Sequence, residues 1–214
     1  MSDLFSSAEA VLQRIPALDA EVYYLHSLDL GRSADELLHA LTTETPWRQE
    51  SVIVWGKLFS QPRLIAWYGD TGSSYTYSGI NLAPLPWTNL LRALKGRVEA
   101  AAGSSFNSVL LNYYRDNRDS MGFHSDDEPE LGERPIIASV SLGEERIFVL
   151  KHKTKKFVRP FRLKLASGSL LLMKGETQRH WKHGITKETV SCGPRVNLTF
   201  RCIESASRVM SRQA

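Results

Sequence analysis

The segment Arg195-Val-Asn-Leu-Thr-Phe-Arg201 alternates polar and apolar side chains over its whole length. In an extended strand, successive side chains point to opposite faces, so this alternation predicts one polar and one apolar face. The polar face would carry Arg195, Asn197, Thr199 and Arg201. Guanidinium groups buried in a barrel are costly unless they meet an anion, and their forked N–H donors suit a dicarboxylate. The segment therefore predicts an inner strand of a β-barrel or sandwich with an anion-binding face.

Other short apolar runs follow one another through the second half of the chain. They span residues 109–114, 136–142, 147–151, 161–165, 169–173 and 196–203, and glycine or proline separates most of them. Six short strands within about a hundred residues are typical of an antiparallel sandwich or barrel.

The first half of the chain contains two helix signals. Ser33-Ala-Asp-Glu36 is a capping box, in which serine and glutamate satisfy backbone N–H groups at a helix start, and leucines follow at helical spacing. A second helix is expected to start after Pro86 and to run to Ala102, with Gly103 as its natural stop. We therefore expect a single α+β domain in which N-terminal helices pack against one sheet.

The composition is that of an ordinary globular protein. The 214 residues are 42% hydrophobic and 23% charged, and no run of about eighteen apolar residues predicts a membrane span. The N-terminus carries no secretory pattern, and the only cysteines are Cys192 and Cys202. A reduced intracellular setting is expected, the cytoplasm of a bacterium or the nucleus of a eukaryote, with a monomer as the default. The net charge of +4 mildly favours polyanionic partners.

A candidate metal site centres on His124 and Asp126. These residues stand two positions apart, so in an extended chain both side chains leave on the same side. A third ligand has to come from elsewhere; His183 is the candidate, and His180 is the alternative that spacing cannot exclude. Two histidines and one carboxylate form the facial triad of non-haem iron(II) oxygenases, which leaves positions open for cosubstrate and oxygen.

Four motifs resemble the AlkB family of iron(II)- and 2-oxoglutarate-dependent dioxygenases. They are Asn112-Tyr-Tyr114, His124-Ser-Asp126, Trp181-Lys-His183 and Arg195-Val-Asn-Leu-Thr-Phe-Arg201, in the order and spacing of the family. The segments 122–129 and 135–143 look especially like the AlkB homologues 2 and 3 of animals. The resemblance covers roughly residues 52–203.

The resemblance implies a double-stranded β-helix, or jelly roll, which agrees with the strand pattern. His124, Asp126 and His183 would bind iron(II). Gly184, which follows His183 as in the family, favours this histidine over His180. The 2-oxoglutarate site would consist of Asn112, Tyr114, Arg195, Asn197, Thr199 and Arg201. Arg195 would hold the distal carboxylate, Arg201 would lie near the carboxylate that chelates iron, and no further catalytic side chain is implied.

The resemblance also implies the reaction. Oxygen and 2-oxoglutarate would be converted to carbon dioxide and succinate while the carbon of an N-alkyl group is hydroxylated. The hemiaminal would then release formaldehyde and the repaired base, for example from 1-methyladenine or 3-methylcytosine in DNA. A base inside a duplex cannot reach a buried iron, so the substrate would be a single strand or a flipped base.

Three residues resemble those that surround the damaged base in this family. Tyr77 would stack on the base opposite the His124 ring, and Tyr75 would add a hydrogen bond or a phosphate contact. Asp127 would contact the exocyclic amino group, and its charge would favour cationic methylated bases. The alternative for Asp127 and the adjacent Glu128 is a solvated loop.

Val54, Trp55 and Gly56 resemble a hairpin finger that fills the gap left by the flipped base in homologue 2. The segments 62–69 and 107–112 look more like homologue 3, which prefers single strands. The sequence therefore leaves open the choice between duplex and single strand, and also that between DNA and RNA. An ordinary core tryptophan is the alternative for Trp55.

A basic run between residues 151 and 164 would lie along the nucleic-acid backbone. The lysines expected to contact phosphates are Lys151, Lys153, Lys155 and Lys156. Arg115 and Arg118 would extend this surface. Phosphate contacts give salt-sensitive affinity without sequence preference, and a solvated hairpin face is the alternative.

The chain would form one domain with four parts. Residues 1–50 would be an N-terminal extension packing on the core, 51–105 a nucleotide-recognition lid with its supporting helix, 106–203 the catalytic jelly roll and 204–214 a tail. Two other functions are compatible with these motifs. One is an iron(II)/2-oxoglutarate oxygenase acting on RNA, protein or a small metabolite. The other is a nucleic-acid-binding barrel without catalysis, against which the intact triad argues.

Overall fold

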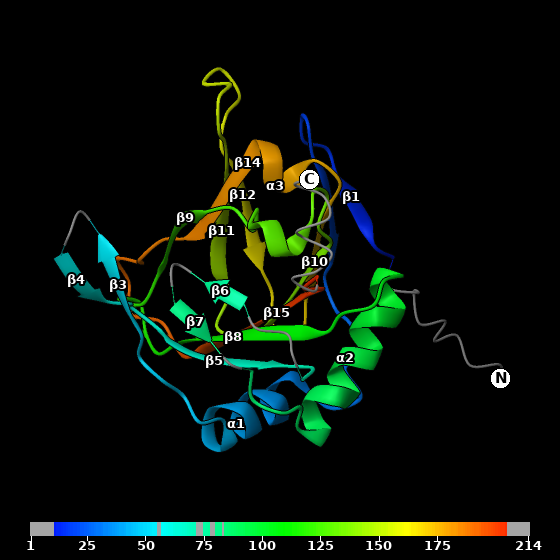
Figure 1. The fold of residues 1–214 in the computed structure, drawn as a ribbon, viewed down its shortest axis with the longest axis vertical. Helices are drawn as coiled ribbons and strands as arrows, with labels where there is room; N and C mark the ends of the chain where they lie inside the picture. The colour runs from blue at the N-terminus through cyan, green and yellow to red at the C-terminus, as the bar shows by residue number, and fades with distance from the viewer. Residues whose placement is uncertain (1–10, 55–56, 72–74, 78–79, 83, 205–214) are drawn as a thin grey trace, which may run out of the picture.

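The computed structural model describes residues 11–54, 57–71, 75–77, 80–82 and 84–204, which form two facing β-sheets with helices on one side (Figure 1). The larger sheet contains, in spatial order, β1 (Gln13–Ile15), β2 (Glu21–Leu25), β13 (Leu170–Lys174), β10 (Ile137–Gly143), β15 (Arg195–Arg201), β8 (Ser108–Tyr114) and β5 (Leu64–Gly69). The smaller sheet contains β12 (Phe161–Leu165), β11 (Arg146–His152), β14 (Trp181–Ile185) and β9 (Met121–His124). All neighbouring strands in both sheets are antiparallel. The predicted jelly roll is confirmed.

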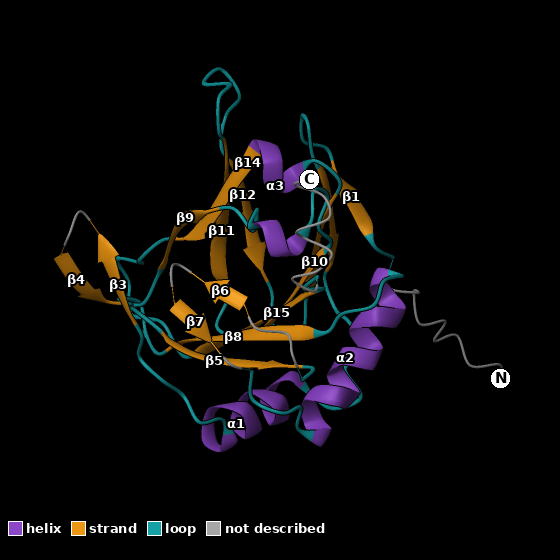
Figure 2. Ribbon diagram, viewed as in Figure 1, coloured by secondary structure: helices purple, strands orange, loops and turns teal. Residues whose placement is uncertain are grey.

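Two helices cover the outer face of the larger sheet (Figure 2). The first, α1 (Ala34–Glu44), begins with the predicted capping box between Ser33 and Glu36. The second, α2 (Asn89–Ala102), ends at Gly103, which adopts the left-handed conformation with a φ of 61°. Both elements pack as predicted because their apolar stripes bury leucines against the sheet. The remaining helical turns are η1 (Pro129–Leu131) and α3 (Thr177–His180), and no helix in the described ranges is both long and apolar enough to cross a membrane.

Strand β15 separates two hydrophobic cores. Its apolar residues Val196, Leu198 and Phe200 pack in the core between the larger sheet and the helices. Its polar residues face the second core, where residues of the two sheets meet. The alternation seen in the sequence therefore corresponds to the two faces of this central strand.

The strands predicted between residues 109 and 203 are found with small shifts at their ends, as β8, β10, β11, β12, β13 and β15. Strands β1, β2, β5, β9 and β14 of the two sheets were not predicted. Within the described part of the segment 1–50, α1 packs against the core, and β2 pairs directly with β13 and extends the larger sheet. Short strands such as β1 form only when a neighbouring strand offers hydrogen bonds, so their own sequence predicts them poorly.

Two short hairpins lie beside the sheets (Figure 1). One joins β3 (Ser51–Val54) to β4 (Lys57–Ser60), and the other joins β6 (Tyr75–Tyr77) to β7 (Ile80–Leu82). Both belong to the segment 51–105, which was predicted to form the nucleotide-recognition lid.

Candidate functional site

A narrow cavity between the two sheets is lined by side chains from both of them. The larger sheet provides Asn112, Tyr114, Ser139, Met173, Arg195, Asn197, Thr199 and Arg201. The smaller sheet and the residues after β9 provide Met121, His124, Asp126, Phe148, Leu165, His183, Gly184 and Ile185. All residues predicted to bind a metal or 2-oxoglutarate therefore line one cavity.

The candidate metal ligands converge on one point of this cavity. Neighbouring strands β9 and β14 place His124 directly opposite His183. Nε2 of His124 lies 3.9 Å from Oδ1 of Asp126, and Nε2 of His183 lies 3.9 Å from Oδ2 of the same carboxylate. The ligand atoms of the three residues all lie within 4.8 Å of one another. Two imidazoles and one carboxylate in this arrangement suit iron(II) with open coordination positions.

The surroundings favour the metal-binding protonation states. Burial, reinforced by the nearby His124, lowers the pKa of His183 to about 3. Burial also lowers the pKa of His124. Burial alone would raise the pKa of Asp126, but Arg201 and the two histidines outweigh it and lower this pKa to about 2. Neutral imidazoles and an ionised carboxylate are the forms that bind metal ions.

Hydrogen bonds orient two of these ligands. Nδ1 of His124 lies 2.9 Å from the carbonyl oxygen of Gly122, which assigns the proton to Nδ1 and leaves Nε2 facing Asp126. The backbone N–H of Asp126 donates to Oε1 of the buried Gln178 at 3.0 Å. Gln178 was not predicted, because it lies 52 residues from its partner and a single glutamine carries no sequence pattern.

Gly184 allows strands β14 and β9 to approach each other beside the ligands. A Cβ on this residue would lie 2.8 Å from the carbonyl oxygen of Met121, closer than real Cβ contacts. The pairing of the two strands also shifts in register between His183 and Ile185. Glycine is therefore required here for backbone contact.

Arg195 has the features expected of an anion site. Its side chain is 1% exposed, and Nη2 donates to Oγ of Ser141 at 2.9 Å. Among the described residues, Nε and Nη1 of Arg195 have no hydrogen-bond partner, and burial lowers the pKa of this guanidinium. A buried cation with two unused donors is unfavourable until an anion arrives, so the residues present fit a carboxylate of 2-oxoglutarate.

Hydrogen bonds hold the other polar residues of the cavity in place. Nδ2 of Asn197 donates to Oγ of Ser139 at 2.7 Å, and Oγ1 of Thr199 donates to Oδ1 of Asn197 at 2.9 Å. Nε of the buried Arg63 donates to Oδ1 of Asn112 at 2.7 Å, which leaves the amide NH₂ of Asn112 as its available donor. Arg63 was not predicted, since it precedes β5 in a segment without a recognisable motif.

Arg201 links the anion-binding face to the candidate metal ligands. Its Nη2 donates to Oδ1 of Asp126 at 2.7 Å, and both side chains are almost fully buried. Tyr114 lies at the other end of the polar face, where its ring is 5.1 Å from the guanidinium of Arg195. The two arginines thus lie at opposite ends of the polar face of β15. Arg201 lies beside the candidate metal ligands, and Arg195 lies away from them.

A model of the 2OG-Fe(II) oxygenase superfamily matches residues 21–201, from β2 to β15. The chain belongs to this superfamily. The matched region contains every residue of the cavity described above.

Comparison with individual relatives confirms the resemblance to the AlkB family. The chain is 44% identical to human alpha-ketoglutarate-dependent dioxygenase alkB homolog 3, over 80% of this chain and 62% of that protein. It is 43% identical to the mouse DNA oxidative demethylase ALKBH2, over 79% of this chain and 75% of that protein. The chain thus spans about three fifths of the length of its homolog 3 relatives. The solved structure of OsALKBH1 shares the fold, with a TM-score of 0.55 at 16% identity over 87% of this chain and 99% of that one.

The residues predicted to surround the damaged base are described only in part in this AlkB-family chain. Tyr75 and Tyr77 lie in β6, but their side chains are outside the described part of the structure. Asp127 directly follows the candidate ligand Asp126 and is about half exposed. Its Oδ2 accepts a hydrogen bond from Nζ of Lys153 at 2.7 Å. The carboxylate predicted to contact a cationic base therefore already has an internal cationic partner.

The predicted apolar finger coincides with the turn between β3 and β4. Val54 ends β3 and pairs with Lys57, which begins β4. Trp55, Gly56 and the side chain of Val54 lie outside the described residues. The strands on either side of this segment thus form a hairpin, and the wedge itself stays a prediction.

The predicted phosphate-binding lysines differ in their surroundings. Lys153 is paired with the carboxylate named above, and Nζ of Lys155 lies 2.5 Å from Oδ2 of Asp19. Lys151 and Lys156 are exposed. The charge of the basic run is therefore partly balanced within the chain, and phosphate contact by these lysines stays a prediction.

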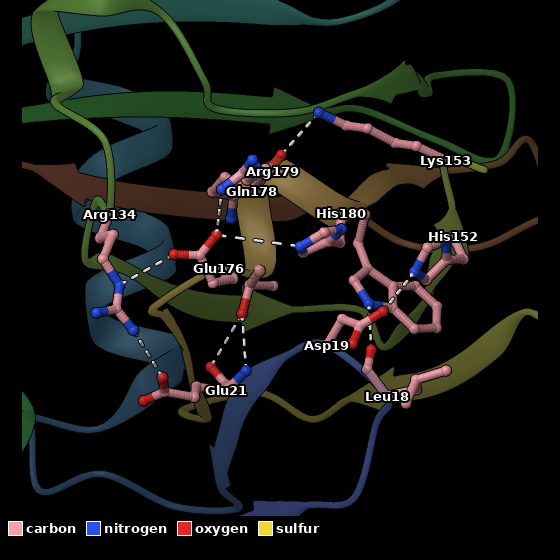
Figure 3. A network of polar contacts seen from close by, with 12 residues as sticks. Leu18, Asp19, Glu21, Arg134, His152, Lys153, Glu176, Gln178, Arg179 and His180 are labelled. Atoms are coloured by element: carbon pink, nitrogen blue, oxygen red, sulfur yellow. Dashed lines mark hydrogen bonds and ion pairs between the residues drawn. The ribbon is translucent and has the colours of Figure 1, made fainter. Parts of the chain in front are cut away.

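His180, the alternative third ligand, lies outside the metal-site cavity. It ends α3, and its ring stacks on that of His152 with 5.8 Å between ring centroids. Together with Asp19 these histidines form a second group of titratable side chains at the end of the smaller sheet (Figure 3). Of the two histidines, only His183 lies with His124 and Asp126.

Proposed function

We propose that this chain is an iron(II)- and 2-oxoglutarate-dependent oxidative dealkylase that acts on N-alkylated bases in DNA, such as 1-methyladenine and 3-methylcytosine. The observation that carries the proposal is that one cavity contains both the candidate ligands His124, Asp126 and His183 and the buried Arg195, whose donors are incompletely used among the described residues. The printed names of its relatives, an alpha-ketoglutarate-dependent dioxygenase and a DNA oxidative demethylase, support the same activity.

The cavity provides separate positions for the metal and the cosubstrate. His124, Asp126 and His183 would hold iron(II), and Arg195 would hold the distal carboxylate of 2-oxoglutarate. The remaining cosubstrate contacts would come from Asn112, Tyr114, Asn197, Thr199 and Arg201. When bound, iron(II), 2-oxoglutarate and oxygen would supply the oxidation that hydroxylates the alkyl carbon next to the base nitrogen.

The side chains of the protein would bind and orient, without acting as nucleophiles. The proton on Nδ1 of His124, held by the Gly122 carbonyl, keeps Nε2 available to the metal. Arg201 fixes one oxygen of Asp126, whereas the other oxygen has no hydrogen-bond partner among the described residues and can serve the metal. The apolar residues between the sheets exclude water from the reacting carbon.

The pair formed by Asp127 and Lys153 directly follows the candidate ligand Asp126, and we infer that the substrate base enters beside this pair. N1-methyladenine and N3-methylcytosine carry a positive charge, so such a base would compete with Nζ of Lys153 for the Asp127 carboxylate. Both side chains are partly exposed, so exchange of one cation for another costs little desolvation. This arrangement supports a cationic N-alkylated base as the preferred substrate.

Formaldehyde release from an oligonucleotide with one 3-methylcytosine tests this function. The reaction would contain iron(II), 2-oxoglutarate and ascorbate, with His183→Ala as the control that lacks a metal ligand. We expect formaldehyde and succinate from the native protein and neither from the variant. Formation of succinate without formaldehyde from alkylated DNA or RNA would show that the cavity is active and that the substrate is a different one.

We also expect the chain to act as a monomer in a reducing compartment of the cell. Cys192 is a free thiol in the structure. Light scattering coupled to size-exclusion chromatography would test the oligomeric state, and a mass near 24.1 kDa is expected.

A further inference from the structure

The connection between β11 and β12 stands out from the body of the molecule (Figure 1). Its tip is a tight turn, in which the backbone N–H of Val158 donates to the carbonyl oxygen of Lys155 at 3.0 Å. This bond makes Lys156 and Phe157 the two central residues of a β-turn. The turn therefore presents one cation and one aromatic ring at the tip of the projection.

Two adjacent apolar residues of this turn have opposite environments. Val158 is partly buried and packs against the core between the sheets. Phe157 is 80% exposed, the most exposed of the large hydrophobic side chains in the described part of the chain. Its neighbours Lys156 and Arg159 are also exposed. The partly buried valine thus holds the turn to the core, while the phenyl ring is exposed to water beside two cations.

Polar contacts hold the base of the turn in one conformation (Figure 3). The backbone N–H of Lys155 donates to Nδ1 of His152 at 3.0 Å, so the His152 proton lies on Nε2, which faces Oδ2 of Asp19 at 3.3 Å. Nζ of Lys155 donates to the same carboxylate oxygen and lowers the pKa of Asp19. The ring lone pair of His152 lies on Nδ1 and accepts the backbone N–H of Lys155, so it is not available to a metal, and this group of residues anchors the turn.

The turn begins close to the candidate ligand Asp126, because Lys153 contacts the next residue, Asp127, and also Gln178, which accepts the Asp126 backbone N–H. At its base, Nζ of Lys153 donates to Oδ2 of Asp127 at 2.7 Å and to the carbonyl oxygen of Gln178 at 2.8 Å. Phe157 lies four positions after Lys153, so the two α-carbons lie at most about 14 Å apart. A nucleic-acid strand whose damaged base occupies the cavity would therefore pass within reach of the ring.

We propose that Lys156 and Phe157 form an aromatic-basic finger that binds single-stranded nucleic acid next to the damaged base. The phenyl ring stacks on an unpaired base, and Lys156 and Arg159 contact the flanking phosphates. Stacking on an aromatic ring tolerates every base, and phosphate contacts are independent of sequence, as repair at any position requires. An intact duplex offers no free base face to the ring, so the finger selects for single strands. This inference rests on the proposed function.

Binding of two lesion-free oligonucleotides to the metal-free protein tests the finger. One is a fluorescent single strand of about 15 nucleotides, and the other has the same backbone with abasic residues at its centre. We expect the native protein to bind the strand with bases about tenfold more tightly, the order of one base–aromatic stack. Phe157→Ala should abolish this preference, whereas Phe157→Trp should retain it.

Two further variants separate stacking from charge and from general effects. Lys156→Ala should weaken binding of both strands equally. It should also reduce the slope of the logarithm of the binding constant against the logarithm of the salt concentration by about one, as for the loss of one phosphate contact. Val190→Ala removes another exposed apolar side chain, 74% exposed, from the loop at the opposite end of β14, and should bind like the native protein. Phe157 is exposed, so its replacement should leave the melting temperature unchanged.

The proposed finger is contradicted if the native protein binds the two strands equally, or if Phe157→Ala keeps the preference for the strand with bases. It is also contradicted if Phe157→Ala weakens binding of the two strands to the same degree. Formaldehyde release without a preference for bases would overturn the finger alone. A base preference that depends on Phe157, without formaldehyde from any alkylated strand, would overturn the proposed reaction and leave the finger in place.

Discussion

At the residue scale, Arg195 shows how a binding site can be recognised from an incomplete hydrogen-bond network. Its guanidinium is almost fully buried, yet two of its three nitrogens have no hydrogen-bond partner among the described residues. Folding has removed this cation from water, and no carboxylate of the described residues pairs with it, which costs free energy. That cost is the energetic basis for binding a carboxylate tightly once 2-oxoglutarate enters.

Replacement of Arg195 by methionine should therefore have opposite effects on binding and on stability. We expect the KM for 2-oxoglutarate to rise by about 10- to 100-fold, because hydrogen bonds to a charged group contribute about 1.5–3 kcal/mol. The ligand-free variant should melt at the same or a higher temperature than the native protein, since an unpaired buried charge is removed. Succinate formation and thermal melting measure the two effects. An Arg162→Met variant on the exposed side of β12 is the control, and an unchanged KM in Arg195→Met would refute the assignment.

At the element scale, the close approach of β14 to β9 brings two candidate ligands together. His124 and His183 are direct partners across these strands, and Gly184 keeps the backbones close. The sequence motifs identified both histidines, but the strand pairing that joins them was not predicted. Strand β14 is short and lies between two partners, so its conformation depends on β9 and β11 more than on its own residues.

Substitution of Gly184 by alanine should disturb this pairing. The added Cβ would lie 2.8 Å from the Met121 carbonyl oxygen, so the strands have to separate. We expect the free energy of unfolding to fall by about 1–3 kcal/mol, as for overpacked sites, with loss of metal binding. Gly96→Ala is the matched control: Gly96 is exposed within α2 and a Cβ there meets nothing within 4 Å. This control should be more stable by about 0.5–1 kcal/mol. Equal denaturation midpoints for the two variants would contradict the explanation.

At the scale of the whole molecule, the buried titratable residues of the cavity make the free energy of unfolding depend on pH. In the metal-free protein the pKa of His183 is about 3, below its usual 6.5, because folding buries the imidazole. Between these values the unfolded chain binds one more proton than the folded chain, so the free energy of unfolding falls as the pH decreases. The depressed pKa of Asp126 extends this loss of stability below pH 3.8, since its ionised form is stabilised in the folded state.

We expect the free energy of unfolding of the metal-free protein to decrease by about 1.4 kcal/mol per pH unit for this proton below pH 6.5. In His183→Gln, this dependence of the free energy of unfolding on pH should become weaker by the contribution of about one proton. His39→Gln, on the exposed face of α1, should keep the native pH dependence. Urea denaturation at a series of pH values provides the measurement. A variant with the native slope would show that His183 is not buried in its neutral form.

The sequence by itself determined the features that are local and repetitive. The capping box of α1, the stop of α2 at Gly103, the alternation along β15 and the spacing of His124 and Asp126 all depend on neighbouring residues, and the structure contains each of them. From the residues alone, the choice between His183 and His180 stayed open until the family resemblance was considered.

The tertiary structure decided which distant residues meet. Gln178 reaches Asp126 across 52 residues, Arg63 reaches Asn112 across 49, and Lys155 reaches Asp19 across 136. The Lys155–Asp19 contact also shows that part of the basic run is already paired within the chain, whereas Phe157 is held outward between the exposed Lys156 and Arg159. Such contacts depend on strand order and register over the whole jelly roll, and these are set by the packing of many strands together, which the residues of one segment do not encode.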